Sequence, residues 1–158
     1  MSAPRTAAIV SGYFSPLHIG HLDLIEGAGQ LADEVFVIVN NNAQQEMKKG
    51  KVIIDEKDRL RIVLALRDVT HAIIAVDEDR TVSASLHHLA EAFPDHQLIF
   101  ANGGDRIPDF VPEAATCEKH GIEMAFGVGG DDKADSSSRI NMELGLEDAQ
   151  SAPPSATT

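Results

Sequence analysis

Two histidines three residues apart, His18 and His21, follow an apolar segment near the start of the chain. Positions i and i+3 of a helix are neighbours, so a helix beginning here would bring both imidazoles to one face of its first turn. The amino end of a helix also carries unpaired backbone N–H groups and the positive end of the helix dipole. Gly20, between the histidines, lets a ligand approach the backbone closely. These residues predict a binding site for phosphate groups.

The place of the histidines favours a phosphate site over the alternative, a helix start with two solvated histidines. The apolar residues 7–10 predict a short buried strand, and Gly12 begins a turn directly after it. A strand, a glycine turn and a helix in this order form a compact unit that holds phosphate at the helix start.

Residues 12–21 resemble the signature of the HxGH nucleotidyltransferases, the cytidylyltransferase-like superfamily, whose pattern is roughly G-x-F-D-x-x-H-x-G-H. Ser15 stands where the family usually has aspartate. Serine keeps a helix-capping or turn role, but it removes a carboxylate from the site. The matching residues are Gly12, Phe14, His18, Gly20 and His21. The resemblance implies that His18 and His21 are catalytic and that Gly12, Tyr13, Phe14, Ser15 and Gly20 bind the nucleotide.

Residues 47–51 (Met-Lys-Lys-Gly-Lys) form the basic cluster of an acidic chain, and we expect them in a loop after the second strand. A solvated surface loop is an equally good interpretation of the sequence alone. The family places a phosphate-binding lysine in this loop. The resemblance therefore implies a phosphate contact for Lys48, Lys49 or Lys51, with Lys49 taken as catalytic.

Three further segments resemble family elements in their order along the chain. The helical pattern of residues 55–67 is similar to the family's E-x-x-R helix, so Arg59 is expected to bind phosphate, or else to form a surface i,i+4 ion pair. Residues 102–106 (Asn-Gly-Gly-Asp-Arg) are similar to a G-G-D element that holds the nucleotide, although a plain turn would also fit. The serine run 136–138 is similar to an element that grips the β- and γ-phosphates at a helix start, with a linker as the alternative. The nucleotide-binding residues implied here are Arg59, Gly103, Gly104, Asp105, Arg106, Ser136, Ser137, Ser138 and Arg139.

Apolar strands alternate with helices along the chain. Short, wholly apolar strands separated by helices are typical of a parallel sheet that is covered on both faces. Crossover handedness then predicts an α/β fold, a Rossmann-like three-layer sandwich with a five-stranded parallel sheet and a ligand outside the carboxyl ends of the strands. Strands are predicted at 7–11, 35–39, 72–76, 97–101 and 123–127, and helices at 19–32, 55–67, 82–92 and 112–120.

The 158 residues include 13 Lys plus Arg and 25 Asp plus Glu, a formal net charge of −12. A surface this acidic argues against nucleic acid or an anionic membrane as a partner. No apolar run reaches the roughly 20 residues that cross a bilayer, and no signal-peptide pattern is present. Cys117 is the single cysteine, which excludes a disulfide framework and a cysteine zinc site. We expect a cytoplasmic protein with one nucleotidyltransferase domain at 1–146 and a disordered tail at 147–158.

The resemblance implies in-line transfer of a nucleoside monophosphate from ATP or CTP to a phosphorylated small molecule, such as a sugar or polyol phosphate, with release of pyrophosphate. A phosphate nucleophile is already ionised near neutral pH, so catalysis would rest on positioning and charge stabilisation. Mg²⁺ is expected to bridge phosphates with few protein ligands. ATP is favoured by the G-G-D element and by the absence of a cytidylyltransferase R-T-x-G segment. We also expect a homodimer.

Two other classes of protein remain as alternatives. A non-catalytic nucleotide-binding module would give the histidine pair no purpose, and the chain has no G-x-G-x-x-G fingerprint for a dinucleotide. A metal-dependent hydrolase needs carboxylates clustered at strand ends, and only Asp77, Asp79 and Asp105 approach this requirement.

Overall fold

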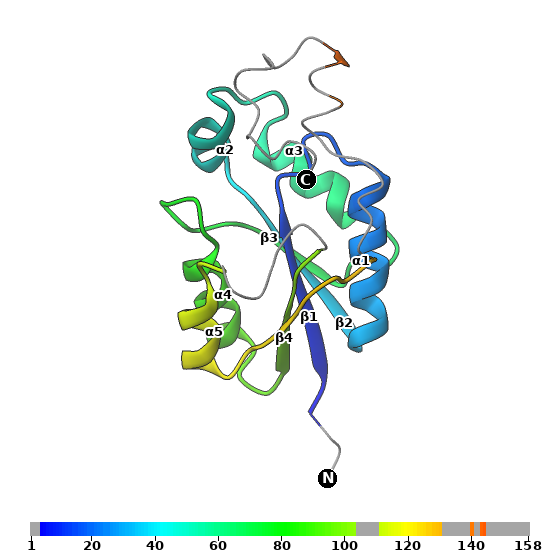
Figure 1. Ribbon diagram of the computed structural model, residues 1–158, viewed down its shortest axis with the longest axis vertical. Coiled ribbons are helices and arrows are strands. Elements are labelled where there is room, and N and C mark those ends of the chain that lie inside the picture. Colours follow the sequence, from blue (N-terminus) through cyan, green and yellow to red (C-terminus); the bar gives the residue numbers. More distant parts are fainter. Residues whose placement is uncertain (1–3, 104–110, 131–139, 141–142, 145–158) are drawn as a thin grey trace.

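The computed structural model describes residues 4–103, 111–130, 140 and 143–144 (Figure 1). The predicted tail at 147–158 lies outside these residues. In chain order the described elements are β1 (Thr6–Gly12), α1 (Ile19–Leu31), β2 (Glu34–Val39), α2 (Asn42–Lys49), α3 (Glu56–Leu64), β3 (His71–Ile74), α4 (Ser83–Ala92), β4 (Gln97–Ala101), α5 (Ala114–His120) and β5 (Glu123–Ala125).

The five strands form one parallel sheet in the order β3-β2-β1-β4-β5. The chain moves outward from β1 to β3 and then crosses back to place β4 on the other side of β1. Helix α1 lies on the opposite side of the sheet from α4 and α5 (Figure 1). The predicted α/β, Rossmann-like sandwich with a five-stranded parallel sheet is confirmed. The crossing between β1 and β4 is the topological switch point at which such sheets bind ligands.

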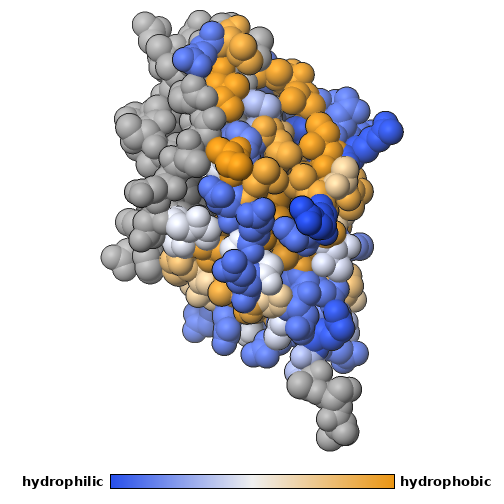
Figure 2. Space-filling view, turned by 90° about the vertical axis from the view of Figure 1, so that its right-hand side faces the viewer, coloured by the Kyte–Doolittle hydropathy of each residue, from blue (hydrophilic) through white to orange (hydrophobic). Residues whose placement is uncertain are grey.

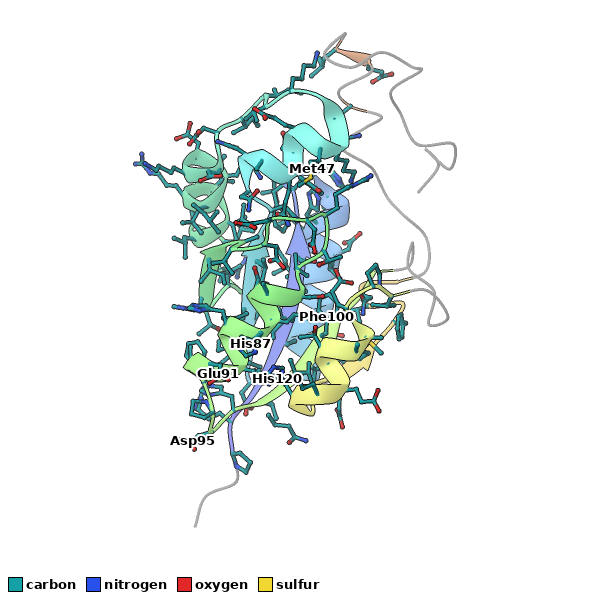
Figure 3. The ribbon with its side chains drawn as sticks, turned by 90° about the vertical axis from the view of Figure 1, so that its left-hand side faces the viewer. Met47, His87, Glu91, Asp95, Phe100 and His120 are labelled. Carbon is teal, nitrogen blue, oxygen red and sulfur yellow. The ribbon has the colours of Figure 1, made fainter. Side chains whose placement is uncertain are left out.

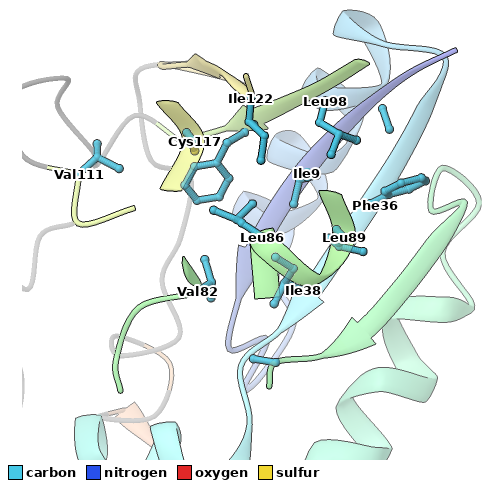
Figure 4. Packing of buried hydrophobic residues seen from close by; sticks show 13 residues of the cluster. Ile9, Phe36, Ile38, Val82, Leu86, Leu89, Leu98, Val111, Cys117 and Ile122 are labelled. Atoms are coloured by element: carbon cyan, nitrogen blue, oxygen red, sulfur yellow. The ribbon is translucent and has the colours of Figure 1, made fainter. Parts of the chain in front are cut away.

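Strand β1 supplies both faces of the core, because successive side chains of a strand point to opposite sides. Ala7 and Ile9 pack in a cluster with Leu86 of α4 and Cys117 of α5, part of which is shown in Figure 4. Ala8 and Val10 pack in a second cluster with residues of α1 and α3. Full burial on both faces explains why this strand is wholly apolar.

Residues 42–49 form helix α2, so the prediction of a loop at 47–51 is wrong for residues 47–49. Asn41 caps the helix, since its side chain accepts a hydrogen bond from the backbone N of Gln44 at 2.8 Å. The helix ends at Gly50, which has a left-handed φ of 81° that glycine adopts without strain. An asparagine before the helix and a glycine after it are helix signals. The segment between them lacks an apolar stripe, so periodicity did not reveal it.

Several predicted boundaries also move by one to three residues. Helix α3 is shorter than predicted at both ends, because Asp55 is its N-cap and Ala65 its C-cap. Strands β3 and β5 each end two residues earlier than expected.

Candidate active site

Among the described residues, the turns that carry several predicted site residues lie where the parallel strands end. The backbone N of Asn40, after β2, donates to the carbonyl of Gly12 at the end of β1 over 2.9 Å. The backbone N of Asn102, after β4, donates to the carbonyl of Ala125 in β5 over 2.8 Å. Turns that follow four strands therefore share one edge of the sheet, as the switch-point rule requires.

His18 and His21 stack on each other at the amino end of α1, with ring centroids 3.9 Å apart. His18 is the N-cap, and its Nδ1 accepts a hydrogen bond from the backbone N of Gly20 at 3.0 Å. The Nδ1 of His21 accepts one from the backbone N of His18 at 3.2 Å. Because both Nδ1 atoms are acceptors, a neutral ring at either position carries its proton on Nε2. Each histidine therefore has an Nε2–H donor of the kind that binds a phosphate oxygen.

Phe14 and Ser15 form the support beneath the histidines. Phe14 and Ser15 are both predicted to bind the nucleotide. Each is only 2% exposed, so neither side chain is open to a ligand. The Phe14 ring lies 4.7 Å from the His21 ring, centroid to centroid. Ser15 takes part in a turn, but the cap of α1 is His18.

The close approach of Phe14 to the strand explains Gly12. A Cβ atom at Gly12 would come within 3.0 Å of the Phe14 ring. Phe14 itself has a φ of 53°, in the left-handed region that non-glycine residues rarely adopt. Such strained positions persist only where the surrounding structure determines them, and they concentrate at functional sites.

Arg59 is fully buried, which excludes the predicted surface ion pair and gives the residue a different role from the predicted phosphate contact. Its guanidinium donates to the carbonyls of Tyr13 (2.9 Å), Asn40 (2.6 Å) and Ile54 (2.8 Å). A further bond reaches the Oδ1 of Asn42 at 3.0 Å. Arg59 thus connects the turns that follow β1 and β2. It also connects these turns to the amino ends of α2 and α3.

The buried guanidinium of Arg59 lies close to two carboxylates, those of Glu56 and Asp55. Burial lowers the pKa of Arg59, whereas the nearby carboxylates of Glu56 and Asp55 act in the opposite direction. The same carboxylates bind Asn42, whose backbone N donates to Glu56 Oε1 at 2.7 Å and whose Nδ2 donates to Asp55 Oδ1 at 2.9 Å. The hydrogen bond from Asn42 is the largest cause that lowers the pKa of Asp55. Helices α2 and α3 are therefore joined at their amino ends.

Lys48, in the basic cluster, contacts the histidine turn. Its Nζ lies 4.4 Å from the centre of the Tyr13 ring, within the range of a cation–π interaction. Lys48 and Lys49 occupy the last turn of α2, while Lys51 follows the helix and is exposed.

Arg80 is a basic residue of this edge that sequence reasoning missed. Burial raises the pKa of Tyr13, and the positive charges of Arg80 and Arg59 oppose that shift, which places Arg80 within electrostatic range of the Tyr13 hydroxyl. Arg80 is exposed and lies in the turn after β3. The signal that could have identified Arg80 is its place in the sequence, four residues after the end of the predicted strand at 72–76.

The backbone on either side of Arg80 is fixed by α2. The Nε2 of Gln44 donates to the carbonyls of Asp79 and Thr81, each at 2.8 Å. The Nδ2 of Asn41 donates to the carbonyls of Ala75 and Asp77, each at 3.0 Å. The side-chain amides of Asn41 and Gln44 therefore hold the turn after β3 against the helix that carries Lys48.

On the other side of β1, the described chain reaches Gly103, which follows β4. Gly129 packs on α1 with a φ of 84°, and a Cβ there would come within 2.6 Å of the Asp23 carbonyl. A Cβ at Gly27 would come within 2.6 Å of the Gly129 backbone N. The turn after β5 therefore packs directly on α1. The predicted nucleotide-binding residues Gly104, Asp105, Arg106, Ser136, Ser137, Ser138 and Arg139 lie outside the described residues.

Asp77 and Asp79 have structural roles, against the hydrolase alternative. Asp77 is 5% exposed and accepts hydrogen bonds from the backbone N atoms of Ala84 and Ser85 at the start of α4. Asp79 accepts from the backbone N and hydroxyl of Thr81. In the part of the chain that the structure describes, no three His, Cys, Asp or Glu residues form a metal-binding group. The described helices also include none that is long and apolar enough to span a membrane.

Curated relatives of the chain include proteins named FAD synthase and bifunctional protein HldE. The FAD synthase of Methanohalophilus mahii is 36% identical over 104 residues, which make up 66% of this chain and 67% of that protein. The FAD synthase of Methanospirillum hungatei is 41% identical over 71 residues, or 45% of each chain. The bifunctional protein HldE of Streptomyces coelicolor is 32% identical over 118 residues, which cover 73% of this chain and 24% of that protein. The aligned region thus spans two thirds of the first relative, 45% of the second and about a quarter of the third.

A solved structure shares the fold. The lipopolysaccharide core biosynthesis protein from Thermoplasma volcanium superposes with a TM-score of 0.59 and 23% identity, over 77% of this chain and 93% of that one. The family model described as cytidylyltransferase-like matches residues 9–143, which include both histidines and the predicted elements that follow them. The predicted membership of the nucleotidyltransferase superfamily is confirmed: the chain belongs to the cytidylyltransferase-like family.

Proposed function

We propose that this chain transfers a nucleoside monophosphate, AMP in preference to CMP, from a nucleoside triphosphate to the phosphate of a small molecule, with release of pyrophosphate. The observation that carries the proposal is the stacked pair His18 and His21. Their Nδ1 atoms are bound to the backbone at the amino end of α1, so each neutral ring keeps an Nε2–H donor.

The proposed step is an in-line displacement. An oxygen of the acceptor phosphate attacks the α-phosphorus, the bond to the bridging oxygen breaks, and pyrophosphate leaves with the electron pair. The Nε2–H groups of His18 and His21 donate to phosphate oxygens as negative charge shifts toward the leaving group. The loss of one such fixed donor typically lowers kcat by about 10²–10³.

Mg²⁺ bound with the nucleotide would supply further positive charge at the phosphates.

We assign Lys48 and Arg80 to the phosphates on the β2 and β3 side of the histidines. Lys48 lies over the Tyr13 ring, and Arg80 lies within electrostatic range of the Tyr13 hydroxyl. In a chain with a net charge of −12, two positive charges near Tyr13 of the histidine turn favour an anionic ligand there. Lys48 therefore replaces Lys49 as our choice for the phosphate-binding lysine.

The acceptor is proposed to be a sugar or polyol phosphate. FMN belongs to this class because its phosphate is esterified to a ribityl chain, and several relatives are named FAD synthase. Relatives named HldE support a sugar phosphate as the other member of the class.

The test combines purified protein and Mg²⁺ with ATP or CTP and with FMN, a heptose 1-phosphate or glycerol 3-phosphate. We expect pyrophosphate release that needs both a nucleotide and one of these acceptors, with ATP the better nucleotide. A faster reaction with CTP would reverse the choice of base. The absence of pyrophosphate in every combination would contradict the proposal.

A homodimer also belongs to the proposal. Figure 2 shows a hydrophobic area on the side of the molecule where α1 and α3 lie. Helix α3 also carries two exposed apolar side chains, Ile62 and Leu64, which are 43% and 50% exposed. Large exposed apolar patches on a protein surface mark sites of interaction with other molecules. Sedimentation equilibrium should give twice the chain mass, and a monomer mass at tens of micromolar would contradict the dimer.

A further inference from the structure

Two histidines on neighbouring helices meet on the side of the sheet that α4 and α5 cover (Figure 3). The Nδ1 of His87 in α4 lies 2.8 Å from the Nε2 of His120, the last residue of α5. Their ring centroids are 4.8 Å apart. His120 precedes β5 in the chain, and it borders a pocket of about 490 Å³ with Pro4 and Gln97, which precede or begin strands. This histidine pair therefore lies toward the amino ends of the strands, at the edge opposite the candidate active site.

The contact between the two rings requires that they share one proton, because one nitrogen must donate and the other must accept. Glu91, one turn after His87, has its Oε1 3.8 Å from the other nitrogen of His87. A carboxylate beside Nε2 favours a proton there and leaves a lone pair on Nδ1. His120 then donates its Nε2–H to that lone pair. When His120 takes the tautomer protonated on Nδ1, two lone pairs face the same point.

The 2.8 Å contact is the hydrogen bond between the rings, and a metal ion that replaces the shared proton would hold the two nitrogens about 2.9–3.3 Å apart. Imidazole nitrogens suit divalent transition metals, and the affinity of a nitrogen site rises through Ni²⁺ to Cu²⁺ and falls at Zn²⁺.

We propose that His87 and His120 form a binding site for a divalent transition metal, Cu²⁺ or Ni²⁺, that links α4 to α5. The two imidazoles are adjacent ligands, Glu91 orients His87, and water completes the coordination. The described residues offer no third protein ligand that completes a metal-binding group, so the affinity comes from two imidazoles and their fixed spacing. That spacing is set by the core, where Leu86 and Leu89 of α4 pack in one cluster with Cys117 of α5.

The experiment titrates Cu²⁺ into a variant with His18→Ala and His21→Ala, because the stacked pair could bind the same ion. We expect one tight Cu²⁺ ion per chain, an electron paramagnetic resonance spectrum with splitting from two nitrogens, and a rise in the melting temperature. Adding His87→Ala or His120→Ala should weaken the binding at least tenfold. Ni²⁺ should bind more weakly than Cu²⁺, and Zn²⁺ should not bind more tightly than Ni²⁺.

The matched control is His88→Ala, which removes the exposed neighbour of His87 on α4. This change should leave the Cu²⁺ affinity within twofold of the starting variant. The proposal is overturned if His87→Ala and His120→Ala leave the affinity unchanged, or if His88→Ala weakens it equally. Melting temperatures without metal show whether each variant is folded.

Discussion

At the scale of single residues, the candidate site separates the side chains that can bind a ligand from those that hold them in place. His18 and His21 do both, since each accepts a backbone hydrogen bond at the start of α1. Phe14 and Arg59 belong to the support alone, because both are buried. Their types and positions match the family pattern, yet neither side chain is open to a ligand.

Replacing Arg59 should destabilise the fold strongly. The change Arg59→Met removes the donor for three carbonyls and for Asn42 Oδ1. Each buried polar group left unpaired costs about 1–3 kcal/mol, so we expect a loss of several kcal/mol in the free energy of unfolding, measured in urea. The control Arg61→Met, at an exposed position of the same helix, should change it by less than about 0.5 kcal/mol. Equal effects of the two changes would refute the support role.

At the scale of elements, the helices on the β2 and β3 side of the site are positioned by amide side chains. Asn41 caps α2, Gln44 holds the turn after β3, and Asn42 joins α2 to α3. The contacts of Asn42 with α3 and of Gln44 with the turn after β3 connect segments that lie 13 to 37 residues apart in the chain. Side chain–backbone contacts over such separations leave no periodic pattern, so the sequence did not reveal them.

The side-chain amide of Gln44 should contribute far more to the free energy of unfolding than that of Gln45. Gln44 and Gln45 are both buried, but among the described residues only Gln44 has partners for its side-chain oxygen. The change Gln44→Met leaves the carbonyls of Asp79 and Thr81 without this donor and should lower the free energy of unfolding by about 2–4 kcal/mol. It should also raise the KM for the substrate whose phosphate Arg80 binds, because the turn that carries Arg80 is released.

The matched control is Gln45→Met, which replaces a side chain of similar size whose Oε1 has no hydrogen bond within the described ranges. Its cost in unfolding free energy should be below about 1 kcal/mol, because no bond of that oxygen is lost. If the two methionine variants unfold at the same urea concentration, Gln44 does not hold the turn.

At the scale of the whole molecule, the sequence predicted the sheet but only part of the site. Strands such as β1 and β2 are recognisable because burial on both faces makes them continuously apolar. The histidine pair was found because it directly follows such a strand. The burial of Arg59 and the place of Arg80 depend on how separate loops pack together, and local residue patterns do not encode that packing.

Burial of Cys117 in the core should make stability fall at high pH. Burial raises the pKa of this thiol to about 11, whereas an unfolded cysteine titrates near 8.5. The folded state then holds its proton more tightly, so this contribution is complete below about pH 8.5 and is lost as the pH rises toward 11. Between pH 7.5 and 10.5 the unfolding free energy should fall by about 2 kcal/mol more than that of Cys117→Ser. Parallel curves for the two proteins would show that the thiol does not contribute.

The central claim is that His18 and His21 act on the phosphates of a nucleotide, and it needs variants that keep the cap of α1. The start of α2 shows which residues can replace the histidines, because Asn41 and Gln44 form the same reciprocal cap there. The changes His18→Asn and His21→Gln should therefore preserve the helix start.

The decisive measurement is the rate of pyrophosphate release by these two variants, with ATP, Mg²⁺ and the acceptor that the native protein uses. The account predicts a kcat lowered by about 10²–10³ in each variant, as for other lost donors to a transition state. The melting temperature should stay within a few degrees of that of the native protein. A kcat within threefold of the native value in both stably folded variants would contradict the account.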